Sequence, residues 1–222
     1  MSTTDLIAAY PSLVFDLDGT LVDSAPDIGN TLSMAMADCG LAPWPADTLL
    51  PNLFSTLPGI VQELLESRGE SLAYVEPVVE AFRIRQQTSA FTASRPYPGV
   101  LAFLEACHKL GKRMAVCTNK RHGDAVKMLA HFKLQDYFSH VIGCDSAVRA
   151  KPDPAPLLMV LAHLGARPAE ALLFGDTHVD ALCAQKSEVG FVWHRGGYGG
   201  DEVLSHPVAA SFHSFRELGK AS

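Results

Sequence analysis

Residues 13–24 read LVFDLDGTLVDS, an apolar run that gives way to acidic and turn-forming residues. Leu13, Val14 and Phe15 make a run that is too short for a core helix and suits a buried strand. The Asp-Gly-Thr that follows is a turn signal, so Asp16 and Asp18 stand where the strand ends and lean to the same side. Carboxylates are almost never buried unless they are paired or bind a cation. The stretch therefore predicts a strand whose carboxyl end holds two acidic groups and a metal ion.

The rest of the chain changes its periodicity near residue 96. Residues 24–91 have apolar spacings typical of helices and of no strand, whereas helix and strand patterns alternate strictly from residue 96 onward. We expect helices at 28–39, 60–69, 75–87, 100–110, 122–132, 154–164 and 179–186, and further strands at 113–117, 140–143, 170–174 and 190–193. This alternation predicts an α/β fold with a doubly wound, parallel, Rossmann-like core sheet, into which a small all-helical domain is inserted. The expected boundaries are 1–22 with 96–222 for the core domain, and 23–95 for the helical domain.

The composition limits the kind of partner and the location of the protein. The 222 residues carry a formal net charge of −6 and have a pI of about 5.8, which argues against binding of nucleic acid. The five cysteines are scattered and never form a Cys-x-x-Cys pair, which favours reduced thiols in the cytoplasm. We see no secretory leader and no apolar run of membrane-spanning length. We therefore expect a cytoplasmic monomer or homodimer that contacts neither nucleic acid nor membrane.

Polar side chains follow several of the predicted strands and loops. They are Asp16, Asp18, Thr118, Asn119, Lys151, Asp176 and Asp180. In a doubly wound sheet such groups meet in the crevice beyond the carboxyl ends of the strands. The carboxylate oxygens suit Mg²⁺, which takes a few carboxylates together with waters and substrate phosphate. The ammonium, hydroxyl and amide donors suit phosphoryl oxygens, and Gly19 lets backbone N–H groups approach the same anion.

Structural interpretations exist beside these functional ones. Lys151 precedes a proline and could be a solvated loop residue, and Thr118 could cap the helix that follows it. Asp176 and Asp180 could serve as acidic residues that complement a helix dipole. We favour function because all of these groups come from the strand ends of one predicted sheet.

The set resembles the haloacid dehalogenase superfamily. The matching motifs are the DxDGT of residues 16–20, Thr118, Lys151 and the acidic motif at 175–180, which occur in the order and spacing of the family. Further stretches are similar to the phosphoglycolate phosphatase-like branch, namely residues 97–100, 117–120, 150–154 and 197–199. The helical domain resembles the small cap that the family inserts after its first motif.

This resemblance implies a Mg²⁺-dependent phosphatase that hydrolyses a small phosphate monoester through an aspartyl-phosphate. Asp16 would be the nucleophile, and Asp18 would be the general acid and then the general base. Thr118 and Lys151 would hold the phosphoryl oxygens, with Gly19 and Asn119 as further phosphate-binding residues. The metal would be held by Asp16, the backbone carbonyl of Asp18, and Asp176, with Asp180 nearby.

The substrate is less well defined than the reaction. The resemblance implies phosphoglycolate or a related phosphorylated metabolite, but the matching cap loop, Asn52–Gly59, has one glycine and no basic residue. An ester with a neutral or apolar group would fit that loop better than a second anion. A β-phosphoglucomutase-like phosphomutase is the alternative reaction, because it shares every core motif. A binding protein without catalysis is a further alternative, against which the complete motif set argues.

Overall fold

The computed structural model describes residues 3–45, 53–88 and 91–218 of the chain. The chain divides into two compact units. Unit 1 consists of residues 1–23 and 96–222, and unit 2 consists of residues 24–95. Each unit is built around its own buried core, so each is described by itself.

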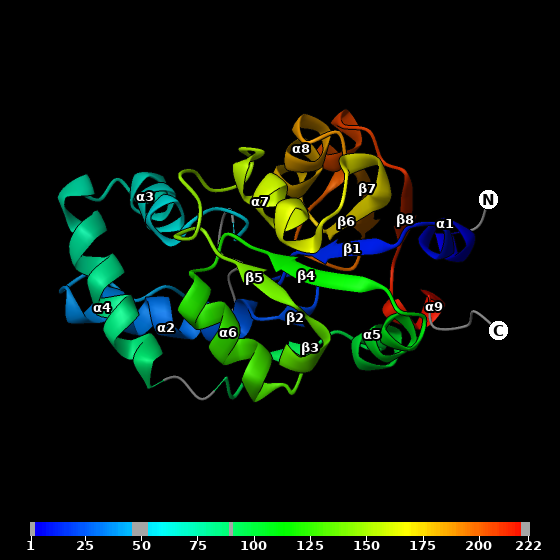
Figure 1. Ribbon diagram of the computed structural model, residues 1–222. Helices are drawn as coiled ribbons and strands as arrows, with labels where there is room; N and C mark the ends of the chain where they lie inside the picture. The colour runs from blue at the N-terminus through cyan, green and yellow to red at the C-terminus, as the bar shows by residue number, and fades with distance from the viewer. Residues whose placement is uncertain (1–2, 46–52, 89–90, 219–222) are drawn as a thin grey trace. The chain divides into compact units, whose positions relative to one another are not determined.

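Unit 1 contains a six-stranded parallel sheet in the order β5-β4-β1-β6-β7-β8 (Figure 1). The strands are β1 (Ser12–Phe15), β4 (Arg113–Cys117), β5 (His140–Ile142), β6 (Ala171–Gly175), β7 (Gly190–His194) and β8 (Ala210–Phe212). Strand β1 lies in the middle, and Phe15 is in register with Val116 of β4 and with Phe174 of β6. All four residues of β1 are buried, as expected for a strand covered on both faces. The predicted α/β class with a parallel doubly wound sheet is confirmed.

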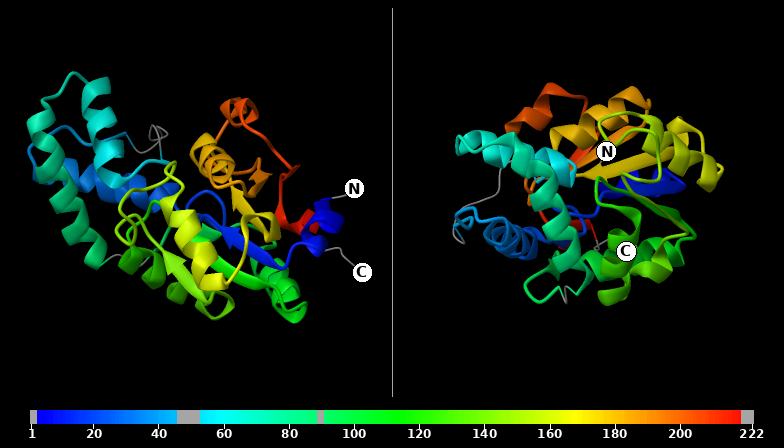
Figure 2. Two further views of the ribbon diagram at one scale, coloured as in Figure 1. Left: turned by 45° about the horizontal axis from the view of Figure 1, so that its top comes forward. Right: turned by 90° about the vertical axis from the view of Figure 1, so that its left-hand side faces the viewer.

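Helices cover both faces of this sheet (Figures 1 and 2). One face packs against α7 (Ala155–Leu164) and α8 (His178–Lys186), in a cluster that includes Val14. The next residue of β1, Phe15, belongs to the opposite face, where its ring stacks on Phe174 with centroids 4.7 Å apart. Helices α5 (Val100–Lys109) and α6 (His122–His131) lie on that second face. Alternate residues of β1 therefore supply two separate cores, and the strand is fixed between them.

Several short elements of unit 1 do not follow from the sequence patterns. They are α1 (Thr3–Ala9), β8 and α9 (Phe215–Leu218). Strand β8 has three residues, which is too short to display a period, and it forms only because β7 offers a parallel edge. Strands β2 (Val22–Asp23) and β3 (Arg95–Pro96) form a separate two-stranded sheet.

The described residues of unit 2 form three α-helices around a single apolar core. They are α2 (Ala25–Asp38), α3 (Leu57–Ser67) and α4 (Val75–Gln87). Helix α3 begins three residues earlier than the expected start at Ile60, because Pro58 lies in its first turn, where a missing N–H costs nothing. The carboxylate of Asp27 accepts hydrogen bonds from the backbone N–H groups of Ala93 and Ser94, which ties the end of the unit to α2.

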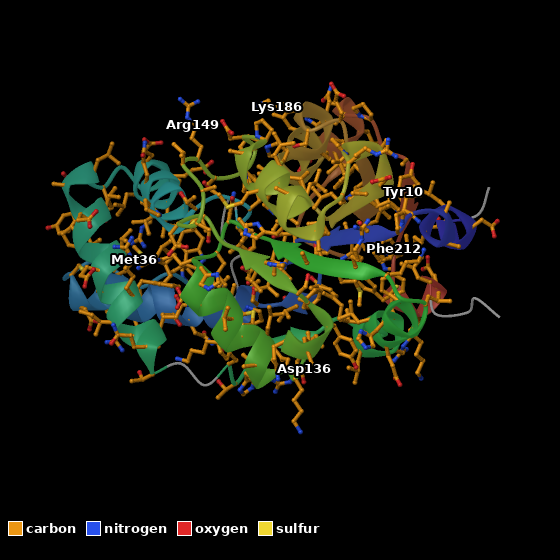
Figure 3. The ribbon with its side chains drawn as sticks, in the orientation of Figure 1. Tyr10, Met36, Asp136, Arg149, Lys186 and Phe212 are labelled. Atoms are coloured by element: carbon orange, nitrogen blue, oxygen red, sulfur yellow. The ribbon has the colours of Figure 1, made fainter. Side chains whose placement is uncertain are left out.

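Apolar side chains form the interior of each unit, and most charged side chains extend from its surface. Met36 of α2 and Phe212 of β8 are buried, whereas Arg149 extends outward (Figure 3).

All five cysteines are free thiols. Within the described residues, no helix has both the length and the apolar character needed to cross a membrane.

Candidate active site

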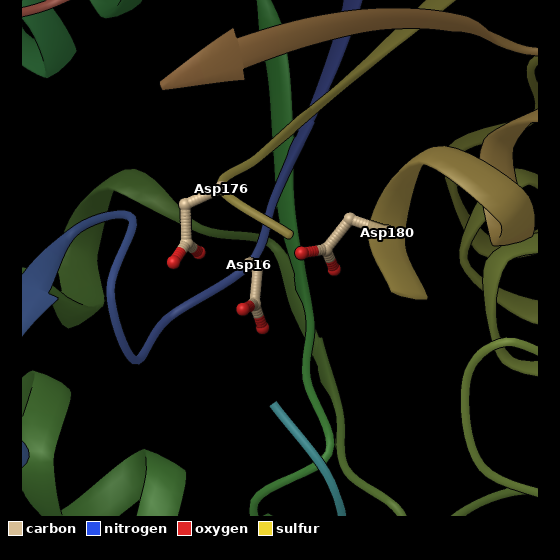
Figure 4. A group of neighbouring side chains, drawn as sticks. All are labelled: Asp16, Asp176 and Asp180. Carbon is tan, nitrogen blue, oxygen red and sulfur yellow. The ribbon is translucent and has the colours of Figure 1, made fainter. Parts of the chain in front are cut away.

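Three carboxylates meet at the carboxyl edge of the sheet in unit 1 (Figure 4). Asp16 follows β1 and Asp176 follows β6, and the two strands are parallel neighbours, so both residues leave the sheet at the same edge. Asp180 comes from the first turn of α8. One carboxylate oxygen from each of the three lies within 4.8 Å of the others. The structure therefore brings together three of the four residues that were predicted to hold a metal.

Lys151 supplies a buried ammonium group to this cluster. Its Nζ lies 2.8 Å from Oδ1 of Asp16 and 2.6 Å from Oδ1 of Asp180. The side chain is only 2% exposed, so the interpretation as a solvated loop lysine does not describe it. Burial opposes its charge, yet Asp16 and Asp180 together raise the pKa of Lys151 well above its usual range. The group is a permanent cation beside the predicted nucleophile.

Asn119 fixes the backbone of Lys151. Its amide Nδ2 donates to the carbonyl of Lys151 at 3.0 Å, and its Oδ1 accepts from the backbone N–H of Lys151 at 2.9 Å. This reciprocal pair holds the end of β4 to the loop before α7. The amide that was predicted to bind phosphate is thus engaged with the backbone of the lysine.

Thr118 is buried at the end of β4. Its hydroxyl accepts a hydrogen bond from the backbone N–H of Lys120 at 3.2 Å. The N-cap residue of α6 is Arg121 rather than Thr118, so the hydroxyl of Thr118 serves the turn after β4 and does not cap the helix.

Asp176 is completely buried and is held by two donors. The hydroxyl of Thr20 donates to Oδ1 at 2.8 Å, and the backbone N–H of Tyr198 donates to Oδ2 at 2.8 Å. Gly19 has a φ of +83°, and a Cβ there would collide with the carboxylate of Asp176. A Cβ at Gly197 would meet the same carboxylate. The turn after β1 and the loop after β7 can therefore approach Asp176 only because both positions are glycine.

Asp180 combines a structural role with its place in the cluster. Its Oδ2 accepts from the backbone N–H of Thr177 at 3.2 Å and from the hydroxyl of Thr177 at 2.8 Å, which forms a capping box at the start of α8. Its Oδ1 binds Lys151. The predicted helix-terminus role is thus present, and it orients the carboxylate toward the lysine.

Asp18 does not belong to the three-carboxylate cluster. Both of its oxygens lie 3.0 Å from Nζ of Lys120, and the two side chains are 13% and 8% exposed. Lys120 was not among the predicted site residues, although it is the second residue after Thr118 at the end of a predicted strand. Thr20 and Tyr198 were also missed as partners of Asp176.

The charges of these groups do not balance among themselves. With all four carboxylates ionised, these and the two ammonium groups would carry a net charge of −2 in a largely buried place. Burial raises the pKa of Asp16 to about 7, against the lowering effect of Lys151. Burial and the neighbouring carboxylates Asp180 and Asp16 raise the pKa of Asp176 well above its usual range. A divalent cation with a preference for oxygen ligands would remove this excess of charge, so the residues fit Mg²⁺.

Fold and site together define a hydrolase with its acidic residues on a Rossmann-like sheet: the chain belongs to the haloacid dehalogenase-like hydrolases, whose family model matches residues 13–194. The chain is 34% identical over 209 residues to a phosphoglycolate phosphatase of Rhodobacter capsulatus, and the match covers 94% of each protein. It is 33% identical over 175 residues to a phosphoglycolate phosphatase of Aquifex aeolicus, with 79% of this chain and 80% of that protein covered. On the strength of these relatives the chain is a phosphatase.

Solved structures share the fold of this chain. The crystal structure of a predicted phosphoglycolate phosphatase from Haemophilus somnus superimposes with a TM-score of 0.85 at 25% identity, covering 95% of this chain and 96% of that one. A predicted phosphatase from Clostridium acetobutylicum shares the fold with a TM-score of 0.82 at 22% identity, covering 95% and 97% of the two chains.

Proposed function

We propose that this phosphatase hydrolyses a small phosphate monoester, phosphoglycolate or a related phosphorylated metabolite, in a Mg²⁺-dependent reaction with Asp16 as the nucleophile. The observation that carries the proposal is the buried cluster in which Lys151 binds Asp16 and Asp180 beside Asp176. Phosphoryl transfer requires positioned groups and neutralisation of charge more than any special covalent chemistry, and this cluster supplies both.

The metal would be held by the carboxylates of Asp16 and Asp176 and by the backbone carbonyl of Asp18, with Asp180 close by. When bound, Mg²⁺ supplies positive charge that offsets the charge of the phosphoryl oxygens. The two excess negative charges of the cluster support this assignment, as do its carboxylate donors.

Asp16 is the proposed nucleophile because Lys151 holds one of its carboxylate oxygens in a fixed direction. An oxygen of Asp16 attacks phosphorus in line, the bond from phosphorus to the ester oxygen breaks, and the phosphoryl group is left on Asp16. Asp18 gives its proton to the departing alkoxide. It then takes a proton from the water that attacks phosphorus, which releases phosphate and restores Asp16.

The remaining residues of the site bind and position. Thr118 and Lys151 are proposed to hold the phosphoryl oxygens, and the backbone at Gly19 is proposed to donate to them. Asn119 is proposed to act chiefly through Lys151, because its amide is paired with the lysine backbone. Unit 2 is proposed to serve as a cap domain whose loop, which includes Leu53 and Phe54, selects the substrate; Asn52, also assigned to that loop, lies outside the described residues.

A phosphate-release screen over a panel of phosphorylated metabolites, with Mg²⁺ and with EDTA, tests this proposal. We expect turnover of small phosphate monoesters with Mg²⁺ and loss of turnover with EDTA. In Asp16→Asn, turnover with Mg²⁺ should fall by roughly a thousandfold or more. Asp136→Asn is the matched control, since Asp136 is an exposed acid far from the cluster in sequence. Undiminished turnover in Asp16→Asn would overturn the assignment, and accumulation of an isomerised sugar phosphate would indicate a mutase instead.

A further inference from the structure

The loop after β7 places one tyrosine in contact with three separate parts of unit 1. The backbone N–H of Tyr198 donates to Oδ2 of Asp176 at 2.8 Å, and its hydroxyl donates to Oδ1 of Asp23 at 3.1 Å. Its ring lies against Gly19, where a Cβ would be 2.7 Å from Cδ2 of the tyrosine. The proposed reaction uses Asp176 and Gly19 but gives Tyr198 no task.

Asp23 is the last residue before the chain leaves unit 1. Unit 2 begins at Ser24, and the chain returns to unit 1 at Pro96. The two crossings belong to one small sheet, since β2 ends at Asp23, β3 ends at Pro96, and these strands pair with each other. Tyr97, the residue after β3, hydrogen-bonds with the side chain of Tyr198. The side chain of Tyr198 is therefore bound next to both crossings.

We propose that Tyr198 is a positioning residue that couples metal binding at Asp176 to the strand pair β2–β3, through which the chain leaves and re-enters unit 1. This inference rests on the proposed metal site. The backbone N–H of Tyr198 can orient the Asp176 carboxylate only as well as its own loop is fixed, and the hydroxyl of Tyr198 fixes that loop to Asp23. Partners that orient a ligating carboxylate set the affinity for the metal.

The backbone on both sides of Tyr198 is packed directly against Asp176. A Cβ at Gly197 would collide with the side chain of Asp176, and a Cβ at Gly199 would collide with its backbone carbonyl. Segments packed this closely transmit a displacement instead of absorbing it. The contact with Asp176 and the contact with Asp23 therefore move together.

Coupling between two sites is reciprocal. If the hydrogen bond from Tyr198 to Asp23 strengthens Mg²⁺ binding, bound Mg²⁺ strengthens that hydrogen bond by the same factor. We therefore expect β2 to be held more firmly when the metal is bound, so that the metal site and the crossing segments become ordered together.

A double-mutant cycle on the affinity for Mg²⁺ tests the proposal. The Kd for Mg²⁺ is obtained from the rise in Tm with Mg²⁺ concentration, without any assay of turnover. We expect Tyr198→Phe and Asp23→Ala each to raise this Kd by about fivefold, near the lower end of couplings between sites. The double variant should raise the Kd little beyond Asp23→Ala, because both changes remove the same hydrogen bond.

Two further variants separate the hydrogen bond from other effects. Asp23→Asn removes the negative charge but keeps an Oδ1 acceptor for the hydroxyl, so its Kd should stay close to that of the wild type. A Kd in Asp23→Asn as high as in Asp23→Ala would assign the effect to charge and overturn the proposal. Tyr137→Phe is the matched control, because Tyr137 precedes β5 and so lies at the amino edge of the sheet, opposite the carboxylates.

Hydrogen exchange measures the coupling in the other direction. In the wild type, Mg²⁺ should slow exchange of the backbone amides at 22–24 by about fivefold, and Tyr198→Phe should lose this effect of Mg²⁺. The wild-type exchange rates and Asp23→Ala decide the question if Tyr198→Phe does not fold.

Failure of this proposal differs from failure of the proposed function. If Tyr198→Phe lowers the Tm without Mg²⁺ but binds Mg²⁺ with the wild-type Kd, the hydrogen bond is merely structural and the coupling is contradicted, while the metal site stands. A wild-type protein whose Tm does not respond to Mg²⁺ contradicts the proposed metal site and this proposal with it.

Discussion

At the scale of single residues, the hydroxyl of Thr20 is one of two donors that hold the buried carboxylate of Asp176. Partners of this kind orient a metal-binding carboxylate, and their loss costs about 10- to 100-fold in metal affinity. Thr20→Val removes the donor and keeps a similar shape. We therefore expect the Mg²⁺ concentration for half-maximal phosphatase activity to rise by about tenfold, with a smaller change in kcat.

The measurement is a Mg²⁺ titration of the initial rate. Thr88→Val, in unit 2, is the control, because its hydroxyl donates only to a backbone carbonyl near the end of α4 in the contacts that are described. If Thr20→Val and Thr88→Val give the wild-type Mg²⁺ dependence, the hydroxyl of Thr20 has no part in metal binding.

The sequence reasoning reached the charged residues of the site and missed their partners for a physical reason. Asp16 and Asp176 directly follow apolar strands and Lys151 lies in the loop before α7, so their charged chemistry is visible without coordinates. Thr20 and Lys120 follow turns, where the direction of a side chain depends on backbone angles that no periodic pattern encodes. The pairing of Lys120 with Asp18 joins positions 102 residues apart and could only come from the structure.

At the scale of elements, β7 supports the turn that follows β1. His194, the last residue of β7, donates through Nδ1 to the carbonyl of Gly19 at 3.0 Å, and its ring stacks on Phe212 of β8. Burial lowers the pKa of His194 below its usual range, although the backbone carbonyls of Gly19 and His213 act in the other direction. The histidine is therefore neutral in the folded protein at neutral pH.

Because His194 is buried and its pKa is lowered, we expect the free energy of unfolding to depend on pH. Below about pH 6.5 the unfolded chain binds a proton at His194 before the folded chain does, so the free energy of unfolding falls as the pH is lowered from there to the depressed pKa of the folded state. The contribution reaches at most about 1.4 kcal/mol per pH unit in that window. His194→Gln should remove this part of the slope.

Urea unfolding of wild type and His194→Gln at several pH values between 5 and 7.5, roughly the window set by an ordinary histidine pKa, measures the two slopes. Comparison of the two proteins cancels the titration of the carboxylates that they share. Parallel curves would show that His194 does not titrate differently in the folded and unfolded states.

The elements that the sequence predicted well are those that cross the middle of unit 1. The strand expected at 113–117 is found at those residues, because the four buried residues that follow the exposed Arg113 leave little choice. Strand β6 is displaced by one residue from the expected 170–174, to Ala171–Gly175, since the hydrophobic run does not mark where pairing stops. Strand β8 escaped prediction because its formation depends on the neighbour that it pairs with.

At the scale of the whole molecule, the cluster of carboxylates destabilises the folded state, and a bound divalent cation would reduce this destabilisation. Buried like charges without a counterion destabilise the folded state, and a ligand that binds only the folded state stabilises it by mass action. We expect Mg²⁺ to raise the Tm of the wild type, by an amount equivalent to about 2.7 kcal/mol at a concentration one hundred times the Kd.

Asp176→Asn should lose most of this Mg²⁺-dependent rise in Tm and keep its fold, since an amide can still pair with Thr20 and Tyr198. Scanning calorimetry with and without Mg²⁺ gives both values without any assay of turnover. Asp136→Asn should shift with Mg²⁺ like the wild type. A Mg²⁺ shift of full size in Asp176→Asn would show that the ion binds elsewhere.

The most direct test of the whole account is whether a phosphoryl group forms on Asp16. The enzyme, mixed with substrate and Mg²⁺, is quenched in acid within the first turnover, digested with pepsin at low pH and analysed by mass spectrometry. We expect the peptide with Asp16 to gain the mass of one phosphoryl group, and the same peptide from Asp16→Asn to gain none. A phosphoryl group on another residue, or none on any residue while phosphate is released, would contradict the account.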